Sequence, residues 1–278
     1  MPIAVVTDST ADIPPEVARR HNIHVVPLNL YFGTEEFKDG VTIQADEFYR
    51  RLTESKELPT TSQPAPGEFT ALYEKLGETH DGIISLHLSG KLSKTVNSAA
   101  QGKEAVQADN CRIEVIDTQQ ATASLGLTVL GVSQAVAQGA DMEEALSLAA
   151  DLAARARFDA MLQTLEYLAK GGRVGRAQAF LGGLLKFTPI ITFENGEAQP
   201  VERPRTRRRG IERLKALVTG LAPFDQLAVL HANEPDEAQT LIEELQPFKP
   251  AGGEIVAGRV GPVVGTYGGP GAIGIGFI

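Results

Sequence analysis

The chain of 278 residues exceeds the usual size of a single hydrophobic core, which predicts two domains. With 42% hydrophobic and 22% charged residues, its composition is that of a folded globular protein and excludes a largely disordered chain. The formal net charge of −9 argues against a general binder of nucleic acid or anionic membranes, because such binding needs a basic surface.

Three features of the sequence predict a cytoplasmic protein. Cys111 is the single cysteine, which excludes an intramolecular disulfide and fits a reducing compartment. The first residues lack the basic region and apolar core of a signal peptide. No run approaches the roughly 18 apolar residues that a membrane-spanning helix needs, so we expect no stable membrane insertion.

Short apolar runs alternate with amphipathic stretches through the first half of the chain. The runs predict strands at 3–7, 24–32, 82–88 and 112–117. The amphipathic stretches predict helices that begin near residue 12 or span 44–54, 66–79, 91–108 and 121–138. Strand and helix in regular alternation predict a parallel sheet covered on both faces, so we expect an N-terminal α/β sandwich over residues 1–155.

The second half alternates less regularly, which favours a mixed-sheet α+β domain over residues 156–278. An Ala- and Leu-rich pattern predicts helix over 141–170, with the domain change near 155. Further predicted elements are a helix at 177–185, a strand at 188–193, a Pro- and Arg-rich connector at 200–205, a helix to about 219, a strand at 226–232, a helix at 234–246, and strands at 254–260 and 272–277.

Hydroxyl side chains gather where predicted strands end or helices begin. One cluster is Asp8-Ser9-Thr10, a second is Thr60-Thr61-Ser62 between two prolines, and a third contains Ser89 and Ser93. Ligands of parallel sheets collect beyond the carboxyl ends of the strands, where hydroxyls and free N–H groups can hold an anion. An ordinary helix cap or turn is the alternative for each segment taken alone.

Two arginine-containing segments have an open interpretation. Residues 170–176 combine glycines with Arg173 and fit either a ligand-contacting loop or a plain turn. Residues 203–209 hold five arginines, which fit either a solvated face or a site for an anion or a partner, because cations oppose the dipole at the start of a helix. The glycine-rich stretch 265–274 predicts a tight turn into a final strand.

Signatures of common enzymes are missing from the sequence. It has no Gly-x-Ser-x-Gly elbow, no Cys-x-x-Cys pair and no P-loop. Its five histidines show no metal-ligand spacing with cysteine or carboxylates. We therefore expect neither a metal nor a cofactor, and the pattern offers no obvious general base.

Several motifs in this order resemble those of the DegV family of bacterial fatty-acid-binding proteins. The resemblance covers nearly the whole chain and rests on Thr7-Asp8-Ser9-Thr10-Ala11-Asp12-Ile13-Pro14, Pro59-Thr60-Thr61-Ser62-Gln63-Pro64, Leu92-Ser93-Lys94-Thr95, Lys170-Gly171-Gly172-Arg173 and Gly269-Pro270-Gly271-Ala272.

The resemblance implies a non-catalytic lipid-binding protein with a DegV-like fold. A long-chain fatty acid would thread the interior, and its carboxylate would meet Thr61, Ser62, Ser93 and Tyr267 near the cleft between the domains. Family members present the acid to a fatty acid kinase, which forms an acyl phosphate. Arg205 would then serve the partner or the phosphoryl group, with Arg173 in support.

Tyr267 is a departure, because the family usually has histidine there. A tyrosine hydroxyl can donate a hydrogen bond to a carboxylate, but it does not titrate near neutral pH. Leu- and Ala-rich stretches at 121–132 and 161–185 are candidate tunnel walls, with ordinary core as the alternative. The competing functional hypotheses are a phosphotransfer enzyme for a small hydroxylated substrate and, from the arginine cluster alone, a regulatory DNA-associated protein.

Overall fold

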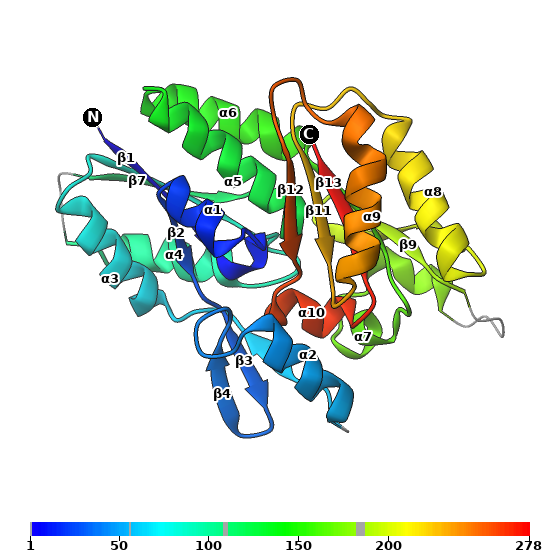
Figure 1. Cartoon of the computed structure of the whole chain (residues 1–278). Helices are drawn as coiled ribbons and strands as arrows, with labels where there is room; N and C mark the ends of the chain where they lie inside the picture. The colour runs from blue at the N-terminus through cyan, green and yellow to red at the C-terminus, as the bar shows by residue number, and fades with distance from the viewer. Residues whose placement is uncertain (1, 56, 108–110, 182–186) are drawn as a thin grey trace.

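The computed structural model describes residues 2–55, 57–107, 111–181 and 187–278. Two β-sheets form the frame of the molecule, and helices pack between and outside them (Figure 1). A third, small sheet projects at the lower edge of the view, beside α2 (Figure 1). The chain therefore has the predicted α/β architecture.

The predicted parallel sheet is confirmed. It has the order β2-β1-β6-β7, and all three pairs are parallel. Every residue of β6 is buried, as expected for a sheet covered on both faces. The strands and helices of this half are β1 (Ile3–Asp8), α1 (Pro15–Arg20), β2 (Ile23–Val26), α2 (Ala45–Glu54), α3 (Pro66–Gly77), β6 (Gly82–His87), α4 (Thr95–Glu104), β7 (Arg112–Asp117), α5 (Thr122–Ala137) and α6 (Met142–Arg155), with a 3-10 turn at Ser9–Ala11.

The single strand predicted over 24–32 is wrong. The chain leaves the parallel sheet after β2 and enters a three-stranded antiparallel sheet of order β4-β3-β5. Pro27 has no N–H for a ladder, and the N–H of Leu28 bonds to the hydroxyl of Ser9 instead. The strands of the small sheet are β3 (Asn29–Phe32), β4 (Glu35–Lys38) and β5 (Thr60–Ser62).

The second large sheet is mixed, as the sequence predicts, with the order β10-β9-β8-β13-β11-β12. Only β11 and β12 pair in parallel, and the other pairs are antiparallel. The elements of this half are β8 (Arg157–Met161), α7 (Glu166–Lys170), β9 (Ile190–Glu194), β10 (Glu197–Glu202), α8 (Arg207–Thr219), β11 (Leu227–His231), α9 (Pro235–Leu245), β12 (Ile255–Arg259), α10 (Pro262–Gly268) and β13 (Ile273–Phe277), with 3-10 turns at Gly175–Phe180 and Gln246–Phe248.

Three predictions for the second half need correction. The helix predicted over 141–170 ends with α6, and β8 follows within the stretch, because five residues are too few for their periodicity to distinguish a strand from a helix. The connector predicted at 200–205 begins as edge strand β10, which tolerates Pro200 at a shift of register. The helix predicted at 177–185 is a short 3-10 turn up to Phe180, and residues 182–186 lie outside the described part.

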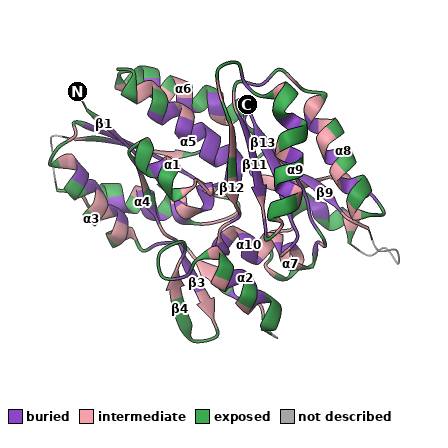
Figure 2. Cartoon of the chain, viewed as in Figure 1, coloured by how far each residue is buried: buried purple, intermediate pink, exposed green. Residues whose placement is uncertain are grey.

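Helix α5 lies between the two large sheets. It contacts β1 and β6 on one side and β8, β11 and β13 on the other, and most of its surface is buried (Figure 2). The close approach of α5 to the mixed sheet depends on small residues, because a Cβ at Gly276 in β13 would lie 2.5 Å from the Cβ of Ala123 in α5. Helices α3 and α4 cover the outer face of the parallel sheet, and α8 and α9 cover that of the mixed sheet.

The division into domains at residue 155 stays a prediction. Among the described residues, the strands of the parallel sheet all precede residue 118 and those of the mixed sheet all follow residue 156. One hydrophobic cluster nevertheless runs from Val5 in β1 through Leu125 in α5 to Leu230 in β11.

Two carboxyl groups face the start of α10. A Cβ at Gly261 would lie 2.9 Å from Oδ1 of Asp12 and 3.5 Å from Oδ1 of Asp39. Desolvation by the surrounding protein raises the pKa of Asp12 to about 8, against hydrogen bonds from Thr122 and Gly261 that lower it. Burial also raises the pKa of Asp39 to about 7, and the neighbouring Asp8 adds to it. Asp39, which is 4% exposed, is more deeply buried than Asp12 and is therefore the better probe.

We expect the free energy of unfolding to fall as the pH rises from about 5 to about 7, by roughly 2 kcal/mol for Asp39. The sign follows because the folded state binds this proton more tightly than the unfolded state, whose carboxyl pKa is near 3.8. Urea unfolding across this range should show a flatter pH profile for Asp39→Asn than for the wild type. The matched change at exposed Asp81, Asp81→Asn, should leave the slope as it is; equal slopes for Asp39→Asn and wild type would contradict the assignment.

Candidate functional site

A cavity of about 360 Å³ lies between the mixed sheet and the loops that follow β1, β5 and β6. Its inner wall is apolar and buried, and it is formed by Phe158, Ala160, Leu162, Ile191 and Ile273. The first turn of α5 closes another side with Ala121 and Thr122. Of the first stretch predicted to line a tunnel, 121–132, only these two residues reach the cavity. From the second, 161–185, the described residues that reach it are Leu162, Leu168, Gly172 and Arg173, and 182–186 lie outside the described part.

The four residues predicted to meet a carboxylate do come together. Thr61, Ser62, Ser93 and Tyr267 all line the cavity, although they come from β5, the loop after β6, and α10. The hydroxyl oxygens of Thr61 and Tyr267 lie 2.5 Å apart, which joins the small sheet to α10. All four are partly exposed, so they form the outer, polar end of the cavity.

Local structure fixes the direction of each hydroxyl. The Ser62 oxygen accepts a bond from the side-chain amide of Asn29 at 3.0 Å. The Ser93 and Thr95 hydroxyls lie 2.9 Å apart at the start of α4. Ser89 is different: it is fully buried, donates to the carbonyl of Gly196 at 2.9 Å, and does not line the cavity.

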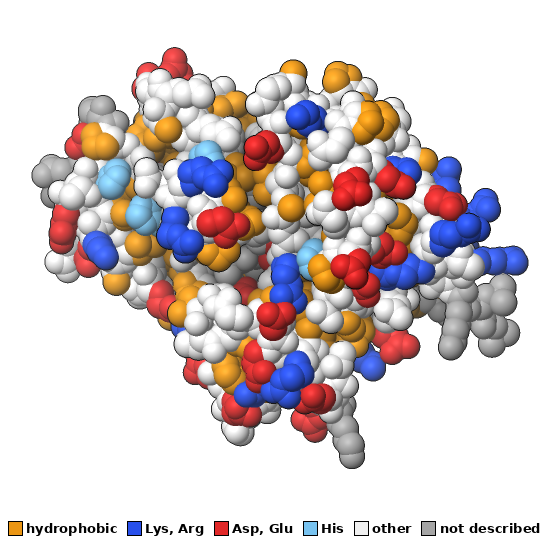
Figure 3. Space-filling model, in the orientation of Figure 1, with side chains coloured by type: hydrophobic (Ala, Val, Ile, Leu, Met, Phe, Trp, Pro, Cys, Tyr) orange, Lys and Arg blue, Asp and Glu red, His pale blue; other side chains and the backbone are white. Residues whose placement is uncertain are grey.

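The two predicted arginines lie in different places. Arg173 lines the cavity, where its guanidinium stacks 5.0 Å from the ring centre of Tyr267 and donates to the carbonyls of Leu92 and Gly171. Arg205 is exposed, precedes α8, and is not part of the cavity wall. Lys and Arg side chains gather at the edge of the molecule where α8 lies (Figure 3).

The charged side chains that line the mouth are cations, although one of them, Lys91, lies 3.9 Å from the carboxylate of Glu197 outside the wall. Lys91, Lys94 and Arg173 are part of the wall, and none of its described residues is Asp or Glu. Lys91 and Lys94 are exposed, so their ammonium groups stay hydrated at the entrance. Sequence reasoning overlooked both lysines, although they flank Ser93 in the same loop. The cavity therefore combines an apolar interior with a polar end that favours an anion.

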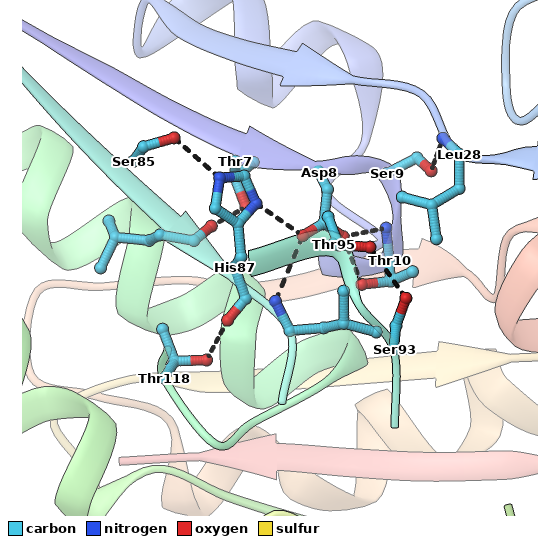
Figure 4. A network of polar contacts seen from close by, with 12 residues as sticks. Thr7, Asp8, Ser9, Thr10, Leu28, Ser85, His87, Ser93, Thr95 and Thr118 are labelled. Carbon is cyan, nitrogen blue, oxygen red and sulfur yellow. Dashed lines mark hydrogen bonds and ion pairs between the residues drawn. The ribbon is translucent and has the colours of Figure 1, made fainter. Parts of the chain in front are cut away.

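A buried polar chain runs behind the site (Figure 4). Nδ1 of His87 lies 2.9 Å from Oδ2 of Asp8, and Nε2 lies 2.7 Å from the hydroxyl of Ser85, which accepts a bond from Tyr73. At its other end, Oδ1 of Asp8 accepts from the N–H and hydroxyl of Thr10, which lines the cavity. Asp8, Ser85 and His87 are fully buried and do not reach the cavity, so Ser85 is not an accessible nucleophile.

Sequence reasoning missed this pairing of Asp8 with His87. The signal was present, because Asp8 directly follows one predicted strand and His87 is the last residue but one of another. The carboxyl ends of neighbouring parallel strands lie at one edge of the sheet. The pairing holds the two strand ends that carry the Thr10 and Ser93 loops.

Within the described ranges, no group of three or more His, Cys, Asp or Glu side chains is placed to hold a metal ion. Among the helices that the structure describes, none has the length and apolar character that crossing a membrane requires.

The fold and the cavity define the class: an α/β protein whose parallel and mixed sheets enclose an apolar cavity with a cationic, hydroxyl-lined mouth. The model of the uncharacterised DegV protein family matches residues 2–278. Protein DegV of Bacillus subtilis is 39% identical over 99% of this chain and 98% of its own. The chain therefore belongs to the DegV family.

Solved structures of the family agree with this fold. A fatty-acid-binding DegV family protein from Thermus thermophilus matches with a TM-score of 0.91 at 33% identity, covering 100% of this chain and 99% of its own. DegV of Bacillus subtilis, described as a fatty acid binding protein, matches at 0.89 and 38% identity, with the same coverage. A stearic acid-binding protein from Eubacterium ventriosum matches at 0.88 and 26% identity, covering 99% and 98%.

Proposed function

We propose that this protein binds one long-chain fatty acid, with the acyl chain inside the cavity and the carboxylate at its mouth. The observation that carries the proposal is the division of the cavity into an apolar interior and an end with three cations and no described acid. Only an amphiphile with a negative head group matches both parts. The fatty-acid-binding relatives support the same class of ligand.

The acyl chain supplies most of the affinity in this proposal. Each buried methylene contributes about 0.8 kcal/mol, so fourteen or so contribute on the order of 11 kcal/mol before ordering costs. The head group then needs hydrogen bonds chiefly to avoid being left unsatisfied. In this proposal the hydrogen bonds come from Thr61, Ser62, Ser93 and Tyr267. The lysines at the entrance attract the carboxylate without forming a buried ion pair with it.

Replacing two of these hydroxyls should weaken retention of the acid. We expect Thr61→Ala/Ser93→Ala to lower affinity roughly 100-fold, because each hydrogen bond to a charged group contributes about 1.5 kcal/mol. Native mass spectrometry of the purified protein, followed by lipid extraction, measures the bound acid. Thr60→Ala is the matched control, since Thr60 is exposed, neighbours Thr61 in β5 and does not line the cavity. A wild-type protein free of lipid would refute the proposal.

We further propose that the protein has no catalytic activity of its own and presents the bound acid to a partner kinase. The carboxylate oxygen would attack the γ-phosphorus of ATP held by that kinase, and ADP would leave. The cavity mouth supports this idea, because the hydroxyls and exposed lysines leave the head group close to the surface. Arg205, exposed at the basic edge before α8, is the proposed contact for the partner. Arg173, in the cavity wall beside Tyr267, is proposed to support the head group.

Phosphorylation of the bound acid by a kinase should depend on Arg205, whereas binding of the acid should not depend on it. With ATP and a bacterial fatty acid kinase subunit, the loaded protein should yield an acyl phosphate that hydroxylamine traps. Arg205→Glu should lower this yield at least about tenfold, through loss of one charged contact at the docking surface, and leave the retained acid unchanged. Arg19→Glu, an equal charge reversal at exposed α1, should change neither. Equal yields from both variants would exclude Arg205 from the contact.

A further inference from the structure

A second cavity, of about 840 Å³, adjoins the first at β9. The end of β7 with the loop after it, and the end of β9 with the turn after it, form its polar walls, with Asp117, Gln119 and Asn195 among their residues. The C-terminal half of α6 forms an apolar wall of small side chains, including Ala150 and Ala153. Nothing in the proposed carboxylate site uses this space.

Phe193 in β9 borders both cavities. Its ring stacks on that of Phe158, with centroids 6.3 Å apart and an interplanar angle of 25°. Phe158 is buried in the wall of the first cavity, and its ring lies against Gly274, where a Cβ would come within 2.1 Å of it. Phe193 itself is only half-buried, whereas its neighbour on the same face, Ile191, is buried.

The register of the mixed sheet explains this position. Side chains of a strand alternate between its faces, so Ile191 and Phe193 point to the side that packs on α5 and the first cavity. Phe193 is next to the end of β9, which stops at Glu194, and the second cavity begins there. A single aromatic ring therefore stands at the boundary between the two spaces.

We infer that Phe193, held by its contact with Phe158, closes the acyl cavity and sets the upper limit of the chain length that the protein accepts. This inference rests on the proposed function and adds the residue that determines its length specificity. Removing the ring joins the two cavities, and the methylenes of a longer chain then lie along the alanines of α6. Each additional buried methylene should raise the affinity about fourfold, which corresponds to about 0.8 kcal/mol.

The test compares the length preference of the wild type with that of Phe193→Ala. Delipidated protein is incubated with an equimolar mixture of saturated fatty acids from myristic to behenic acid, and the bound acids are measured by native mass spectrometry. Phe193→Ala should shift the preferred acid to a longer one, by about 16-fold in relative occupancy for an acid with two more methylenes. Phe193→Leu, a milder truncation, keeps the test valid if the alanine variant does not fold, and it should shift the preference in the same direction.

Phe224→Ala is the matched control. Phe224 belongs to the cluster on the opposite face of the mixed sheet, so its truncation removes the same ring without opening either cavity. It should leave the length profile unchanged. If the wild type binds acid and both Phe193→Ala and Phe193→Leu show the same length profile as the wild type, this inference is wrong and the proposed function is unaffected. A wild type that binds none of the acids overturns the proposed function and this inference with it.

Discussion

The close packing of α5 between two sheets is the constraint on which the rest of the structure depends. Small residues such as Ala123 and Gly276 let α5 touch the mixed sheet while it also rests on β1 and β6. Where α5 begins, at Ala121 and Thr122, this contact gives way to the cavity. The cavity is thus the part of the interface between the two large sheets that side chains leave unfilled. Its interior is apolar because this interface is part of the hydrophobic core.

The polar mouth follows from where parallel strands end. The loops after β1 and β6 carry Thr10 and Ser93 to one edge of the sheet, and the buried pair of Asp8 and His87 holds those strand ends together. The remaining hydroxyls arrive from elsewhere, with Thr61 on the small sheet and Tyr267 on α10. Four separate parts of the chain therefore meet at one opening, and none of them supplies all of its polar groups.

Much of the fold was predictable, because strands such as 3–7 and 82–88 carry strong apolar signals in regular alternation with helices. The failures have physical causes: β8 is too short to interrupt a helical pattern, and glycines conceal α10. The strand-end rule pointed to Ser93 from the residues alone. It could not supply the contact between Thr61 and Tyr267, which lie 206 positions apart and meet only through tertiary packing. Tyr267 was singled out by family resemblance.

The central claim is that an acyl chain fills the cavity at the interface between the two large sheets while its carboxylate stays at the mouth. A crystal structure of the protein as purified tests it most directly. The account predicts continuous elongated density along Ala160 and Ile191, ending in a carboxylate within hydrogen-bonding distance of Thr61, Ser93 and Tyr267. Density for ordered water alone in that space, or a fatty acid with its head group buried and its tail at the mouth, would contradict it.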